Sequence, residues 1–213
     1  MENNSGNYVI FIGIGVCLCF IGIFLFIQFN KTADISASQN MPSQNMSSQN
    51  MPSNKTTAVI IYGSGAKLNL SQVAIVDINN RKITPLSIVA SPHQNDGGNT
   101  GNSTPPGHKN HAIDGILRER DYPNIYHSAS TTGYTSFTLV IPPTDIKYVL
   151  IYNRIGLQPI RARLEKYSLL LQNSSNPQIA KIGLSSDLKQ AYRLSGGVFT
   201  LTNEQTARNS IIN

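Results

Sequence analysis

The chain has 213 residues, 40% of them hydrophobic, and a formal net charge of +6. Its two cysteines, Cys17 and Cys19, lie near the start of the chain. The remainder can therefore hold neither a disulfide framework nor a cysteine-based zinc site, and a domain there must fold on its own hydrophobic core.

Residues 8–27 form an apolar run without a charged side chain. As a helix, this run would extend ~30 Å, the thickness of the hydrocarbon core of a bilayer. We therefore expect an anchor segment 1–29 with one transmembrane helix, and a single-pass protein with the lipid membrane as a partner. A cleaved secretory signal is the alternative, but Glu2 and the absence of Lys or Arg before the run disfavour it, as does the length of the run.

Residues 30–57 contain the sequence SQNMP or SQNMS three times in succession. A period of five matches neither a helix nor a strand, and Gln, Asn, Ser and Pro bury too little apolar surface to fold. We expect a disordered or extended linker. In a second interpretation, Met41, Met46 and Met51 form an extended strap that binds a partner protein, each methionine filling a small apolar depression.

Residues 58–213 carry the pattern of a domain built from short strands. Seven segments are rich in β-branched and aromatic residues, and turn-forming pairs bound several of them: 59–62, 73–78, 86–89, 137–141, 148–152, 167–171 and 198–201. Long amphipathic helical patterns are missing, and we expect at most a turn or two of helix around 185–192. This pattern predicts an all-β domain, an antiparallel jelly-roll β-sandwich.

Residues 68–171 resemble the galactose-binding-like β-sandwich family, which includes the discoidin and coagulation-factor type C domains. The resemblance is carried by LNLSQVAIVDINNRKITPLSIVAS at 68–91, AIDG at 112–115, YHS at 126–128 and FTLVIPPTDIKYVLIYNR at 137–154, which matches a hairpin of the family. It implies that Arg154 pairs with Asp114 as a structural contact. It also implies a structural calcium ion, because several members hold calcium beside the aspartate that corresponds to Asp114.

The chain departs from this family where sugar recognition is concerned. It contains no tryptophan, which the family often places near residue 136, and the His and paired Arg of fucose-binding members have no counterpart. The resemblance therefore implies the fold rather than sugar binding.

Basic residues are concentrated between residues 154 and 166. If this segment joins two strands, Arg161, Arg163 and Lys166 form a basic rim that attracts anionic partners. We expect these three residues to bind a partner and Arg154 to be structural. Nucleic acid is not expected, because no aromatic stacking residues are interleaved with the charge.

Motifs for catalysis are missing: the chain has no G-x-S-x-G, no H-E-x-x-H and no cysteine outside the apolar run. We interpret it as a non-enzyme with no cofactor other than the calcium ion. The order of helix, spacer and sandwich is similar to small minor capsid proteins of large DNA viruses that have an internal membrane. We expect a membrane-anchored structural protein that docks its sandwich onto a protein shell or a neighbouring protein, located in the virion inner membrane or capsid. The alternative is a membrane-anchored lectin or adhesin that binds glycan through residues 94–111.

Overall fold

The computed structural model describes residues 55–94, 104–129 and 132–212. These belong to a compact unit, Asn50–Asn213, that is separate from Met1–Gln49. The expected transmembrane helix and the three linker methionines lie outside the described residues. Within the described ranges, no helix combines the length and apolarity needed to cross a bilayer.

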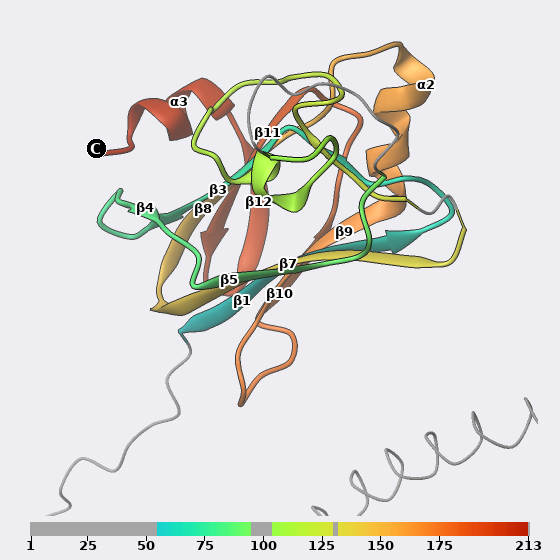
Figure 1. Cartoon of the computed structure of the whole chain (residues 1–213). Helices are drawn as coiled ribbons and strands as arrows, with labels where there is room; N and C mark the ends of the chain where they lie inside the picture. The colour runs from blue at the N-terminus through green and yellow to red at the C-terminus, as the bar shows by residue number, and fades with distance from the viewer. Residues whose placement is uncertain (1–54, 95–103, 130–131, 213) are drawn as a thin grey trace, which may run out of the picture. The chain divides into compact units, whose positions relative to one another are not determined.

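Two five-stranded antiparallel sheets form most of the unit (Figure 1). The first sheet has the order β10 (Ala180–Gly183), β9 (Tyr167–Gln172), β1 (Thr56–Ser64), β7 (Tyr134–Thr144) and β5 (Ser87–Ala90). The second has the order β12 (Val198–Thr202), β11 (Lys189–Ser195), β8 (Ile146–Tyr152), β3 (Gln72–Asp77) and β4 (Lys82–Ile83). A two-stranded ladder joins β2 (Asn69–Leu70) to β6 (Tyr126–His127).

The two sheets enclose one hydrophobic core. Side chains alternate between the two faces of each strand, so every second residue of β1 and β7 points inward. Val59 and Leu139 from the first sheet and Ile75 and Val149 from the second belong to the same buried cluster. The expected all-β antiparallel fold is thus confirmed for the described residues.

A second buried cluster lies on the other face of the second sheet. It contains Val76, Tyr148, Leu150 and Tyr152, and Ala207 of helix α3 (Glu204–Asn209) covers it. Strand β8 is therefore buried on both faces, which explains its unbroken apolar sequence YVLIY.

The structure corrects two expectations about local structure. Strands β7 and β8 do not form a hairpin, because they belong to different sheets and face each other across the core. Pro142 and Pro143 have no N–H to donate to the ladder, and the pairing of β1 with β7 is irregular there. After a last pair between Thr144 and Thr56, the chain crosses to the second sheet, where β8 begins at Ile146. The helical turn expected around residues 185–192 is also wrong: its second half lies in β11, where Ala191 and Tyr192 are buried.

The domain has two distinct ends along the direction of β1. Thr56 begins this strand, two residues before the expected boundary at 58, and Ser64 ends it about 26 Å away. At the Ser64 end, Gly63 pairs with Tyr167 at the start of β9, and the chain arrives there from β8 through two short helices. We call the Thr56 end the entry end and the Ser64 end the loop end.

Candidate functional site

The segment expected to form a basic rim folds as two short helices at the loop end. Helix α2 (Gln158–Arg161) begins after Leu157 and has a proline in its first turn, where no N–H is needed. The 3-10 helix η2 (Ala162–Lys166) follows directly and is fixed to the core by Leu164, which is 2% exposed.

Arg161, Arg163 and Lys166 lie on this helical segment. Arg161 and Arg163 are half-buried and Lys166 is exposed. Among the described residues, none of the three side chains forms an ion pair, and the buried Nε of Arg161 has no hydrogen-bond acceptor. The structure therefore places the three residues together at the loop end with their charges uncompensated. Whether they bind a partner stays a prediction.

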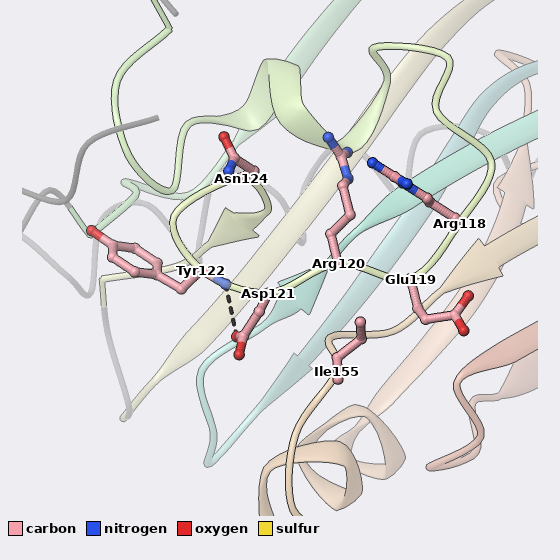
Figure 2. A pocket seen from close by; sticks show the side chains of 7 residues that line it. All are labelled: Arg118, Glu119, Arg120, Asp121, Tyr122, Asn124 and Ile155. Carbon is pink, nitrogen blue, oxygen red and sulfur yellow. Dashed lines mark hydrogen bonds between the residues drawn. The ribbon is translucent and has the colours of Figure 1, made fainter. Parts of the chain in front are cut away.

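An open pocket of about 420 Å³ lies beside this segment (Figure 2). It is lined by Arg118, Glu119, Arg120, Asp121, Tyr122, Asn124 and Ile155. Six of these residues belong to the loop that leads to β6, and Ile155 belongs to the loop after β8. Residues 118–124 match no motif, so they were not among the expected site residues.

Arg120 holds the pocket loop against the sandwich. Its side chain is 10% exposed, and its guanidinium donates to the carboxylate of Asp114 and to the backbone oxygens of Ser71 and His111. The backbone N–H of Arg120 donates to Ser71 Oγ at 2.8 Å, and the N–H of Ile155 donates to the Arg120 carbonyl at 2.9 Å. Arg120 therefore fixes the loop through both its largely buried side chain and its backbone.

The expected pairing of Arg154 with Asp114 is not found. Arg154 instead donates to the carboxylate of Asp121, and Arg120 takes the place beside Asp114. Arg120 and Arg154 each pair with an aspartate of the segment 114–121. Arg120 lies only six residues after Asp114 and forms the pair that was expected of Arg154. The partner expected for Arg154 is thus wrong, and its structural role stays a prediction.

Asp114 does not fit the calcium ion that the resemblance implied. Its Oδ2 accepts from Arg120 at 2.6 Å, and its Oδ1 accepts from the N–H of Ile116 at 3.0 Å and from Arg120 at 3.2 Å. Each carboxylate oxygen is therefore already an acceptor, and an arginine occupies the place where a cation would bind. In the described ranges, no group of three or more His, Cys, Asp or Glu side chains is arranged to hold a metal ion.

Three histidines lie close together at the loop end: His93, His108 and His111. The rings of His93 and His108 meet edge to face with centroids 5.0 Å apart. His108 begins the 3-10 helix η1 (Lys109–Ala112), and its Nδ1 accepts from the N–H of Asn110 at 3.2 Å. Burial lowers the pKa of His108, and the neighbouring His93, Lys109 and His111 lower it further. The available signal was that all four histidines of the chain fall between residues 93 and 127.

Burial also lowers the pKa of His111. The bond between its Nε2 and the carbonyl of Pro105 opposes this shift, as does the nearby carboxylate of Asp114, whereas the charge of Arg120 adds to it. Both histidines therefore lose their proton more readily than an exposed histidine does. Of the loop 94–111, to which the lectin alternative assigns glycan binding, residues 95–103 lie outside the described part.

No protein family, curated protein or solved structure matches this chain. Function must consequently be argued from the site itself.

Proposed function

We propose that this chain is a non-enzymatic, membrane-anchored structural protein that docks its β-sandwich onto a neighbouring protein or protein shell. The observation that carries the proposal is the position of the uncompensated basic rim, Arg161, Arg163 and Lys166. It lies at the loop end, whereas the chain that follows the apolar run enters the domain at Thr56. A domain tethered through its entry end can thus present the basic rim to a partner.

The composition of the loop end supports a protein partner. Ile155 and Leu157 are 46% and 78% exposed, and they directly precede the basic rim. Aliphatic side chains next to arginines are common in protein interfaces, where the apolar contacts contribute affinity and the charges set orientation and association rate. The partner should present an acidic surface.

The finer parts of the proposal rest on the sequence. We propose a jelly-roll sandwich of the galactose-binding-like kind, an anchor helix within residues 8–27, and a linker in which Met41, Met46 and Met51 add contacts to the same partner. The similarity to minor capsid proteins extends the proposal to a viral protein that links an internal membrane to a capsid.

To test the proposal, the full-length protein is crosslinked to its neighbours in its native membranes or particles. The protein is then purified, and the amount of crosslinked partner is measured. Arg161→Glu with Arg163→Glu should reduce the crosslinked partner, more strongly at low salt, because rim charges act mainly through the association rate. The matched control is Lys82→Glu with Arg193→Glu, which makes the same change in charge. Both control residues are exposed, lie on β4 and β11, and form no ion pair in the described part.

Deletion of residues 38–52 should weaken capture if the methionines form a strap, since buried methionine contacts are lost. Equal loss in the rim variant and the control variant would contradict a specific rim contact.

The competing function is a membrane-anchored lectin. Glycan-array binding that is abolished by substitutions in residues 94–111, together with an absence of any stable protein partner, would replace the structural proposal with the lectin. A lectin should also tolerate deletion of residues 38–52, because its linker would only set its reach.

A further inference from the structure

We infer that the pocket at the loop end binds a carboxylate, supplied by an acidic side chain of a partner protein, through the guanidinium of Arg118. The charges of the pocket give the first reason. Of its other charged lining residues, Glu119 pairs with Lys189 at 3.4 Å, Arg120 pairs with Asp114 at 2.6 Å, and Asp121 pairs with Arg154. Three of the four charged groups are thus neutralised by partners.

Arg118 is the fourth charged residue that lines the pocket. It is exposed, and within the described ranges its side chain forms neither a hydrogen bond nor an ion pair. The side-chain amide of Asn124 in the same pocket likewise has no hydrogen-bond partner among the described residues. The pocket therefore offers one free guanidinium and one free amide to a ligand.

The direction of these side chains gives the second reason. Figure 2 shows Arg118, Arg120 and Asn124 extending to one side of the loop, whereas Glu119 and Asp121 extend to the other side with Ile155. Arg120 on this side is already bonded to Asp114 and to two backbone carbonyls. The donors open to an anion are therefore those of Arg118 and Asn124, and the carboxylates of Glu119 and Asp121 point away from them (Figure 2).

The ligand chemistry follows from the donors. A guanidinium presents paired N–H groups whose spacing matches the two oxygens of a carboxylate, and such charge-assisted bonds are stronger than neutral ones. One uncompensated guanidinium matches a single negative charge. Phosphate groups carry more charge and are bound by several cations or by backbone N–H groups.

That the carboxylate belongs to a protein rests on the proposed docking function. That the pocket binds a carboxylate rests only on the donors of Arg118 and Asn124. Ile155 lines the pocket and Leu157 is exposed two residues later, so an acidic residue with an aliphatic neighbour in the partner sequence would match the surface.

The experiment uses the full-length protein in detergent micelles and measures NMR shift changes at residues 118–124. The probes are N-acetyl-glutamate methylamide and its neutral isostere N-acetyl-glutamine methylamide. We expect binding of the acidic probe only, weakened by added salt, and a tenfold or greater loss of affinity in Arg118→Gln. Arg193→Gln is the matched control, since Arg193 is an exposed arginine without an ion pair in the described part, and it should bind as the wild type does.

Three outcomes would overturn the inference: equal binding of both probes, no binding of the acidic probe at millimolar concentration, or equal effects of the two arginine substitutions. N-acetylneuraminic acid, a sugar that carries a carboxylate, is tested in parallel. Its Arg118-dependent binding without binding of the glutamate probe would assign the pocket to an acidic glycan and overturn the protein ligand. If the probes fail to bind but the rim variant still loses its crosslinked partner, the pocket assignment falls and the docking proposal stands.

Discussion

The guanidinium of Arg120 donates a 2.6 Å hydrogen bond to the carboxylate of Asp114, six residues earlier in the chain. The same side chain donates to the carbonyl of Ser71 at 2.5 Å, which joins the pocket loop to the start of β3. The single contact that the resemblance implied between Asp114 and Arg154 is therefore replaced by two ion pairs, Arg120 with Asp114 and Arg154 with Asp121.

We predict that Arg120→Ala destabilises the domain strongly. Hydrogen bonds to charged groups contribute roughly 1.5–3 kcal/mol each, and the backbone carbonyls of Ser71 and His111 lose their charged donor. The free energy of unfolding, measured with urea, should fall by at least about 2 kcal/mol. Arg193→Ala, at an exposed position, should change it by less than about 0.5 kcal/mol. A loss in Arg120→Ala no larger than in this control would show that the pocket loop is held by other contacts.

The two buried clusters yield a second prediction. Leu139 is 1% exposed in the core between the sheets, and Leu150 is fully buried under α3. Replacement of either leucine by alanine should lower the free energy of unfolding by about 2–5 kcal/mol. Truncation after residue 202 removes α3, so it should couple energetically to Leu150→Ala and not to Leu139→Ala in a double-mutant cycle. If the truncation coupled equally to both leucine substitutions, the two hydrophobic clusters would not be energetically separate, and the prediction would be wrong.

Strand composition carried most of the fold prediction. All seven expected strands are present, because runs such as VIIY and FTLVI contain β-branched and aromatic residues that suit a pleated, half-buried surface. Pairing between strands was harder to predict. The family resemblance of residues 137–154 implied a hairpin of β7 and β8, but the two strands lie in different sheets. Burial of β8 on both faces depends on α3, which lies about 50 residues later.

The candidate site was predictable only in part. The concentration of charge between residues 154 and 166 falls on two short helices at the loop end, and its role in binding stays a prediction. The pocket escaped prediction because its shape comes from Arg120, whose partners Ser71 and Asp114 lie on separate segments. Glu119 and Asp121, the acidic residues next to Arg118 in the sequence, pair with Lys189 and Arg154 instead. These pairs form between distant segments, so no local sequence pattern predicts them.

The anchor gives a third prediction. If residues 8–27 span the bilayer, Val16→Arg with Phe20→Arg should release the protein from membranes, since each charge at the centre of a helix costs roughly 2.5–3.5 kcal/mol on insertion scales. The measurement is the membrane fraction that remains after a carbonate wash. An unchanged fraction would contradict the spanning helix, and N-terminal sequencing that begins near residue 39 would indicate a cleaved signal instead.

The histidine cluster predicts that stability falls on mild acidification. Burial and the nearby His93, Lys109 and His111 lower the pKa of His108 below its ordinary value of 6.5, so the unfolded chain binds more protons as the pH falls through 6.5. The contribution of neutral His108 is complete above that pH and decreases below it, where protonation also removes the Nδ1 acceptor for Asn110. His108→Asn keeps a side-chain acceptor at the start of η1 but does not titrate. Its melting temperature should therefore fall less than that of the wild type between pH 7.5 and 5.5. Equal falls in both proteins would show that the acid sensitivity comes from other groups.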